Sequence, residues 1–122
     1  MLLDTHALIW WFEDAPNLSA TARAAIKVGP AVYFSAASIY ETEYKIACGK
    51  MRPLQTTFLE LARSQSFVEL PISARHADLA ARLPSAHKDP WDRVLAAQAI
   101  CESMSVVSRD PRIAALGATV LW

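Results

Sequence analysis

The chain has 122 residues, of which 53% are hydrophobic and 20% charged, and its twelve lysine and arginine residues are balanced by twelve acidic residues. This length allows one compact domain with its own hydrophobic core, and this composition excludes an intrinsically disordered protein. No apolar run approaches the roughly 20 residues of a membrane-spanning helix, and the first residues lack the pattern of a secretory signal. We therefore expect a single domain over residues 1–122, without a membrane partner and located in the cytoplasm.

Short apolar segments alternate with longer helical patterns along the chain, without an internal repeat, which predicts an α/β fold. The strands are expected at residues 2–5, 32–35, 67–70, 105–107 and 119–122. Each is short and mostly apolar, as is typical of strands buried on both faces of a parallel sheet. Helices are expected between them, at residues 19–27, 36–48, 56–63, 73–83 and 90–102, with a short last helix after residue 110.

The helix starts are indicated by capping residues. Ser19 and Ser73 each precede an alanine-rich segment, where a hydroxyl can accept a hydrogen bond from a free backbone N–H. The pairs Asp89-Pro90 and Asp110-Pro111 combine an aspartate cap with proline at the first helical position, which is a stronger indication of a helix start.

Four acidic residues are associated with the predicted strand ends. Asp4 follows the first strand and Asp110 follows the fourth. Glu41 lies in the helix that leaves the second strand, and Asp92 lies in the helix that leads into the fourth. Because open parallel sheets bind ligands at the carboxyl ends of their strands, we expect these four carboxylates to converge at one edge of the sheet.

A cluster of carboxylates without cysteine or histidine is the ligand set that magnesium prefers, and it repels itself when no cation is bound. Bound divalent ions activate water and neutralise the charge that develops during phosphodiester hydrolysis. With these four acids held around metal, the rest of the chain carries twelve cationic against eight anionic residues. That surplus is compatible with a phosphate-containing partner.

Each acid also has a purely structural interpretation. Glu41 precedes Lys45 by four residues, the spacing of an ordinary helix ion pair, while Asp92 and Asp110 stand where acids favour helix N-termini. Asp4 is the hardest to explain in this way, because a carboxylate at the end of a buried strand is costly unless it has a partner. Cys48 and Cys101 lie among apolar residues in predicted helices and are interpreted as buried thiols.

Five segments resemble the PIN-domain toxins called VapC. They are Leu2-Leu3-Asp4-Thr5-His6-Ala7-Leu8, Ser35-Ala36-Ala37-Ser38-Ile39-Tyr40-Glu41, the segment from Lys45 to Lys50, Asp89-Pro90-Trp91-Asp92-Arg93, and Ser108-Arg109-Asp110. Any one of these motifs is weak, but five in this order and spacing identify the family, and the resemblance extends to the terminal Leu121-Trp122.

The resemblance implies a PIN-like fold, with a five-stranded parallel sheet flanked by helices. It implies that Asp4, Glu41, Asp92 and Asp110 are both the catalytic residues and the ligands of Mg²⁺ or Mn²⁺. It also implies an endoribonuclease that hydrolyses RNA with metal-activated water, forms a homodimer and is inhibited by a cognate antitoxin protein. Position 6 is a histidine, whereas many PIN domains have an asparagine there. We interpret His6 as a supporting or structural residue.

Several neighbours of the acids have two interpretations. Thr5 and Ser108 either orient carboxylates or simply end strands. Asp89 precedes Asp92 by one helical turn, so it either assists the metal ions or only caps the helix, and we leave it out of the ligand set. The basic candidates for phosphate contact are Lys45, Arg93, Arg109 and Arg112, with solvated surface charge as the alternative. The aromatic run Trp10-Trp11-Phe12 is assigned to core and partner contacts rather than to base stacking.

Three other classes of function are alternatives. A PIN-like module that binds partners without catalysis is disfavoured by the retained acids. A phospho-acceptor signalling domain has a similar length and a parallel sheet, but it requires paired acids after the first strand and a lysine after the last. A phosphatase with an aspartyl nucleophile requires an acid two residues after Asp4, where this chain has His6.

Overall fold

The computed structural model describes residues 1–84 and 87–122. It contains one sheet of five strands, all parallel, in the order β3-β2-β1-β4-β5. The strands are β1 (Leu2–Leu3), β2 (Tyr33–Ser35), β3 (Val68–Leu70), β4 (Val106–Val107) and β5 (Val120–Leu121). The α/β class and the five-stranded parallel sheet are therefore confirmed, with strand ends that differ from the predicted ones by at most two residues.

Seven helices lie in the described part of the chain. They are α1 (Thr5–Phe12), α2 (Ala20–Val28), α3 (Ala36–Ala47), α4 (Phe58–Ser64), α5 (Ala74–Arg82), α6 (Pro90–Cys101) and α7 (Pro111–Ala115). The last six correspond to the predicted helices, and Ser19, Ser73, Asp89 and Asp110 are their N-caps as expected.

Helix α1 shows where the sequence prediction was wrong. The first strand was expected to continue through Thr5, but Thr5 begins α1, and Asp4 caps that helix by accepting a hydrogen bond from the Ala7 N–H at 2.6 Å. The helix has no apolar stripe to reveal it, because its sequence THALIWWF is hydrophobic on nearly every side.

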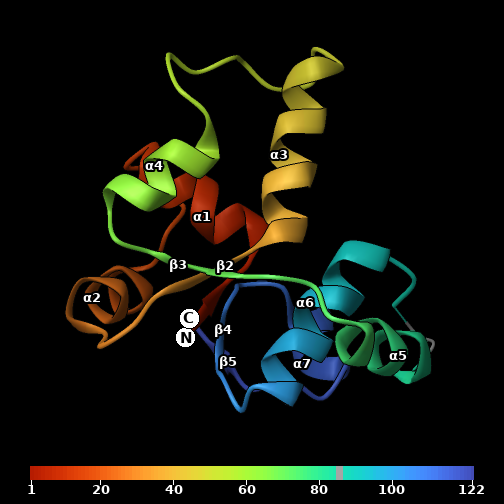
Figure 1. The fold of residues 1–122 in the computed structure, drawn as a ribbon. Helices are drawn as coiled ribbons and strands as arrows, with labels where there is room; N and C mark the ends of the chain where they lie inside the picture. Colours follow the sequence, from red (N-terminus) through yellow and green to blue (C-terminus); the bar gives the residue numbers. More distant parts are fainter. Residues whose placement is uncertain (85–86) are drawn as a thin grey trace.

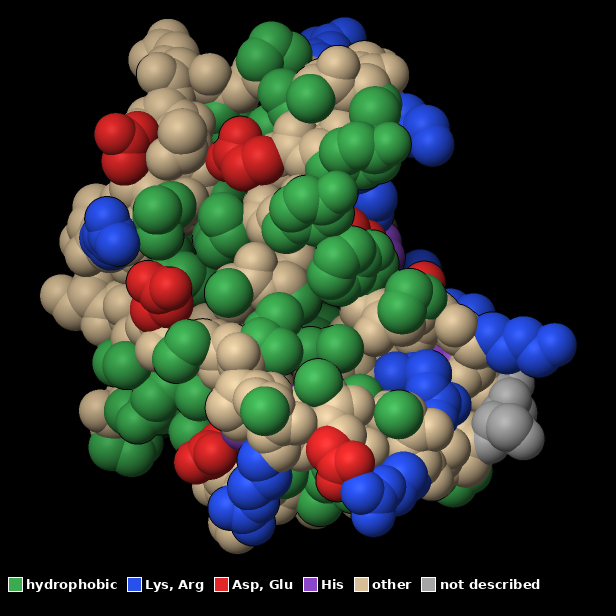
Figure 2. Space-filling view, turned by 45° about the vertical axis from the view of Figure 1, so that its right-hand side comes forward, with side chains coloured by type: hydrophobic (Ala, Val, Ile, Leu, Met, Phe, Trp, Pro, Cys, Tyr) green, Lys and Arg blue, Asp and Glu red, His purple; other side chains and the backbone are tan. Residues whose placement is uncertain are grey.

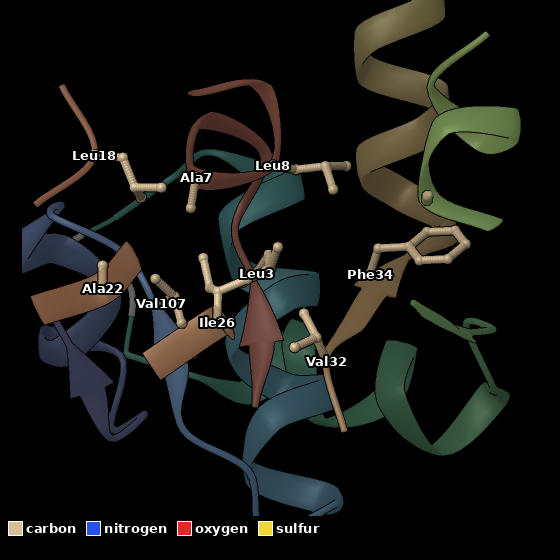
Figure 3. Packing of buried hydrophobic residues seen from close by; sticks show 10 residues of the cluster. Leu3, Ala7, Leu8, Leu18, Ala22, Ile26, Val32, Phe34 and Val107 are labelled. Carbon is tan, nitrogen blue, oxygen red and sulfur yellow. The ribbon is translucent and has the colours of Figure 1, made fainter. Parts of the chain in front are cut away.

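Two hydrophobic cores lie on opposite faces of the sheet, because neighbouring residues of a strand point to opposite sides. Leu3, Phe34 and Val107 pack with residues of α1, α2 and α4 (Figure 3). Leu2 and Val106 pack instead with residues of α6 and α7. Figure 1 shows the same layering, with α1 and α4 on one side of the sheet and α6 and α7 on the other.

The strand order also locates the functional edge. The chain proceeds outward from β1 through β2 to β3, and then restarts on the other side of β1 with β4 and β5. The connections therefore reverse direction between β1 and β4, which is the topological switch point where open α/β sheets bind ligands. Asp4 directly follows β1, and Asp110 follows β4 by three residues.

The prediction of two buried thiols was wrong. Cys48 is exposed, because it is the C-cap of α3 rather than part of its buried face, and Cys101 at the end of α6 is only half-buried. Within residues 1–84 and 87–122, no helix combines the length and the apolar character needed to cross a membrane.

Candidate metal centre

Asp4 is held in place by backbone geometry. Its main-chain N–H donates to Val107 O at 3.1 Å, which joins the ends of β1 and β4, and its side chain caps α1. The residue is 6% exposed. Burial raises the pKa of the Asp4 carboxyl, and hydrogen bonds from the Ser108 hydroxyl and the Ala7 N–H oppose that shift.

Asp110 lies across the switch point from Asp4. Its Oδ1 accepts from the Arg112 N–H at 2.9 Å, and Arg112 Nε lies 2.9 Å from both carboxylate oxygens. The guanidinium of Arg112 consequently lowers the pKa of Asp110. The Ser108 hydroxyl accepts from the Asp110 N–H at 3.0 Å and also hydrogen-bonds the Asp4 carboxyl, so Ser108 contacts both sides of the switch point.

Asp92 lies in the first turn of α6, which Asp89 caps by accepting from the Trp91 N–H at 2.9 Å. Oδ2 of Asp92 lies 2.6 Å from Nε2 of His87, a buried histidine that was not among the residues predicted from the sequence. Burial raises the pKa of the Asp92 carboxyl, and the negative charges of Asp89 and Asp110 raise it further. The hydrogen bond from His87 opposes the shift.

Three of the four predicted acids therefore influence one another. The charge of Asp92 raises the pKa of Asp4, and the charge of Asp110 raises the pKa of Asp92. These residues come from segments separated by up to about a hundred positions in the sequence, and the sheet topology brings them to one edge. The outcome is a shared negative potential at the switch point, in which Asp92 is coupled to both Asp4 and Asp110.

Glu41 lies farther from the start of its helix, α3, than Asp92 lies from the start of α6. It lies in the second turn of α3, where its Oε1 is 2.7 Å from Nζ of Lys45, the ion pair that the spacing indicated. The first turn of α3 does reach the switch point, because the Thr5 hydroxyl donates to Ser38 Oγ at 3.1 Å. In the part of the chain that the structure describes, no contact joins Glu41 to the other three carboxylates.

Among residues 1–84 and 87–122, no three acidic, histidine or cysteine side chains are close enough together to hold a metal ion between them. The four-ligand assignment therefore remains a prediction. The donor set nevertheless suits a hard divalent cation, since it consists of carboxylate oxygens. Two of these carboxylates, Asp4 and Asp92, have pKa values raised by burial and neighbouring negative charge, which a bound cation would relieve.

The four basic candidates separate into distinct roles. Arg93 donates to the backbone carbonyls of Ala80, Leu83, Pro84 and His87 at 2.7–3.0 Å, so it anchors the chain after α5 and is not free for phosphate. Lys45 is paired with Glu41, and Arg112 with Asp110. Arg109 is exposed and lies over the ring of Trp10, 5.0 Å from its centroid.

The aromatic run divides in the same way. Trp11 and Phe12 pack against Phe67, and Phe12 also packs against Phe58, in agreement with the predicted core role. Trp10 instead lines a pocket with His6, Asp4 and Asp110. Acidic, basic and histidine side chains also meet in the hollow at the right-hand side of Figure 2, the side on which α3 and α6 lie in Figure 1.

Together, the doubly wound parallel sheet and the acidic switch point define an α/β domain of the class whose ligand sites lie at the carboxyl ends of the strands. The family model of the PIN domain matches residues 1–118. The chain belongs to the PIN domain family. This family assignment excludes the alternative class of phospho-acceptor signalling domains.

Several solved structures share this fold. The chain superposes on FitAcB from Neisseria gonorrhoeae with a TM-score of 0.71 at 21% identity, covering 99% of this chain and 96% of that one. For VapBC2 from Rickettsia felis bound to a promoter DNA fragment, the TM-score is 0.70 at 13% identity, with 98% and 96% covered. For a toxin–antitoxin complex from Klebsiella pneumoniae it is 0.70 at 18% identity, with 99% and 95% covered. A comparison with curated protein sequences gives no significant match.

Proposed function

We propose that this protein is a metal-dependent endoribonuclease and the toxin of a toxin–antitoxin pair. The observation that carries the proposal is the grouping of Asp4, Asp92 and Asp110 at the switch point of a PIN domain. The ionised form of a carboxylate as buried as Asp4 is stabilised by a positive partner, and no ion pair within the described residues supplies one. A divalent cation is such a partner.

In this proposal Asp4, Glu41, Asp92 and Asp110 hold Mg²⁺ or Mn²⁺. When bound, the cation supplies an activated water and neutralises charge on the scissile phosphate. The Ala7 N–H and the Ser108 hydroxyl fix the direction of the Asp4 carboxylate. His87 fixes Asp92 in the same manner, while Arg112 and Lys45 are counter-ions from which Asp110 and Glu41 must turn to reach a metal.

The partner assignments rest on the fold neighbours and on the VapC resemblance. A toxin–antitoxin complex is named for one neighbour, and VapBC2 bound to promoter DNA for another. By analogy we assign this chain a cognate antitoxin protein, and we expect a homodimer. Cellular RNA as substrate places the proposed activity in the cytoplasm.

The catalytically inactive binding module remains the competing function, because every proposed ligand also makes a cap or an ion pair. RNA cleavage distinguishes the two. The purified protein should cleave RNA with Mg²⁺ or Mn²⁺, stop when EDTA is added, and lose activity in Asp4→Asn, which keeps a cap for α1. Asp78→Asn, which disrupts an exposed ion pair with Arg82 on α5, is the matched control and should cleave normally.

Equal cleavage by the Asp4→Asn variant would reject the role of that carboxylate, and the absence of cleavage by the parent protein would favour the binding module. The toxin assignment has its own test. Induced expression should arrest growth, co-expression of a small protein from the adjacent reading frame should restore it, and Asp4→Asn should be harmless. Sequencing of RNA ends after induction would identify the cleaved RNA.

A further inference from the structure

A pocket of about 400 Å³ opens beside the acids at the switch point. It is lined by the acids Asp4 and Asp110 and by the basic and aromatic side chains of His6, Trp10, Arg109 and Arg112. Its volume falls in the range of roughly 300–1,000 Å³ that is typical of small-ligand sites. A pocket that combines cationic and aromatic groups is suited to a ligand that carries both a phosphate and a ring.

The two arginines of this pocket are in different electrostatic states. Arg112 is neutralised by Asp110, whose carboxylate it contacts through Nε. Arg109 is exposed, and in residues 1–84 and 87–122 it forms no ion pair with a carboxylate. Arg109 is therefore the cation of the pocket whose charge is available to a phosphate.

Trp10 holds Arg109 in place. The guanidinium carbon of Arg109 lies 5.0 Å from the centroid of the Trp10 ring, within the distance of a cation–π contact. The indole is itself fixed, because it packs against the core and meets Trp122 edge-on with ring centroids 5.8 Å apart. The rotamer freedom that an exposed arginine loses on binding is thereby reduced before the ligand arrives.

His6 supplies an aromatic surface beside this cation. Its side chain is exposed, and its ring centroid lies 5.5 Å from that of Trp10 with an interplanar angle of 39°. Imidazole rings are among the groups on which unpaired RNA bases stack. Because position 6 of this chain is a histidine rather than the asparagine of many PIN domains, helix α1 presents a stacking surface close to Asp4.

We propose that this pocket binds one unpaired nucleotide of the RNA substrate, with Arg109 on its phosphate and His6 against its base. Trp10 is a positioning residue that orients Arg109. The proposal rests on the ribonuclease function proposed above and adds to it the side chains that hold the substrate beside the acids. A free cation is needed because Asp4 and Asp110, which line the same pocket, would otherwise repel the phosphate.

The test compares Arg109→Gln with Arg75→Gln, a variant of another exposed arginine without an ion pair in the described residues, on α5 and outside the pocket. The probes are a short fluorescent single-stranded RNA and its duplex, bound without metal and cleaved with Mn²⁺. We expect Arg109→Gln to weaken single-strand binding and to raise KM about tenfold, with kcat largely retained. The slope of log affinity against log salt should fall by about 0.7, the value for one phosphate contact on a single strand.

Trp10 and His6 are tested in the same assay. Trp10→Leu should weaken binding in the parent protein but have no further effect in Arg109→Gln, because a positioning residue acts through the residue that it orients. His6→Ala should weaken binding of the single strand more than that of the duplex, in which bases are already stacked. Mn²⁺ affinity should be unchanged in Arg109→Gln.

The inference is overturned if the parent protein cleaves RNA and Arg109→Gln changes neither KM nor metal-free binding relative to Arg75→Gln. Additive effects of Trp10→Leu and Arg109→Gln would overturn the positioning role. If the parent protein cleaves no RNA, the proposed function fails, whereas binding of single-stranded RNA that depends on Arg109 would still support the subsite.

Discussion

Nε2 of His87 lies 2.6 Å from Oδ2 of Asp92, in a contact that is buried on the histidine side. The histidine precedes α6 and the aspartate lies in its first turn, so the loop and the helix are fixed to each other at the acidic edge. A partner of this kind determines which carboxylate oxygen is available to a metal, as in many carboxylate metal sites.

The first prediction concerns this pair. His87→Ala should lower the affinity for Mn²⁺ about tenfold or more, because the Asp92 carboxylate loses the group that orients it. Isothermal titration with Mn²⁺ measures the effect, and His76→Ala is a control with another buried histidine, which pairs with Glu102 at the opposite end of α6 from Asp92. Equal Mn²⁺ affinity of His87→Ala and the parent protein would contradict the orienting role.

The second prediction concerns Arg93. Its guanidinium donates to carbonyls at the end of α5 and to His87 O, so it stabilises the loop that carries His87. Arg93→Gln should destabilise the fold by about 2–4 kcal/mol, because several backbone carbonyls, most of them partly buried, lose a charged donor at once. Arg93→Lys should restore little, since an ammonium cannot reproduce the planar set of donors.

Urea unfolding measures this loss, and the salt dependence of RNA binding separates it from a phosphate contact. Arg93→Gln should leave the salt slope unchanged, in contrast to Arg109→Gln. If Arg93→Gln instead reduced the salt slope of RNA binding without a loss of stability, Arg93 would be a phosphate-binding residue.

These arginines show why only part of the site could be predicted. Helix starts at Asp89-Pro90 and Asp110-Pro111 are local signals, and apolar runs mark the strands, so the sheet and the acids at its edge were recognisable. The partners of Arg93 and the pairing of His87 depend on how the loop after α5 folds back on α6. No spacing in the sequence encodes that path.

Helix α1 illustrates the same limit. Asp4 is both the end of β1 and the N-cap of α1, and an aspartate at a strand end indicates the first role as readily as the second. The exposure of Cys48 was missed for a related reason. Whether the last turn of α3 packs on the core or extends beyond it is determined by tertiary contacts rather than by its local composition.

The third prediction is a pH dependence. Burial raises the folded pKa of Asp4 above its ordinary value of 3.8, so the unfolded chain ionises first as the pH rises. Without metal, the contribution of Asp4 to stability is therefore greatest below 3.8 and declines as the pH rises from there through the raised pKa. Mn²⁺ should reverse this trend, because it binds the ionised carboxylate.

Urea unfolding at a series of pH values, with EDTA and with Mn²⁺, tests this prediction. Asp4→Asn cannot ionise at this position, so its metal-free stability should fall less steeply with pH than that of the parent protein. Its stability should also gain less from Mn²⁺. Parallel pH profiles of the two proteins in EDTA would show that burial does not penalise the ionised Asp4.

The fourth prediction concerns Gln98, which is fully buried on α6. Its Nε2 donates to Leu70 O at 3.1 Å and to Pro71 O at 3.3 Å, which ties the end of β3 to α6, while its Oε1 has no partner among the described residues. Gln98→Ala should cost about 2–4 kcal/mol, because it opens a cavity and leaves a carbonyl unpaired. Chemical denaturation measures this, with the exposed Gln65→Ala as a control expected to change stability by less than about 0.5 kcal/mol.

The fifth prediction decides between the two roles of Glu41. In its structural role Glu41 only pairs with Lys45, and the partly exposed pair is worth about 0.3–0.5 kcal/mol. Glu41→Gln and Lys45→Met would then reduce stability equally and leave RNA cleavage intact. We expect instead that Glu41→Gln abolishes most cleavage and weakens Mn²⁺ binding, because a metal ligand is lost. Lys45→Met, which removes the competing cation and leaves the carboxylate, should retain or strengthen Mn²⁺ binding. Since both variants break the same ion pair, only a role of the carboxylate beyond that pair can make them differ in cleavage.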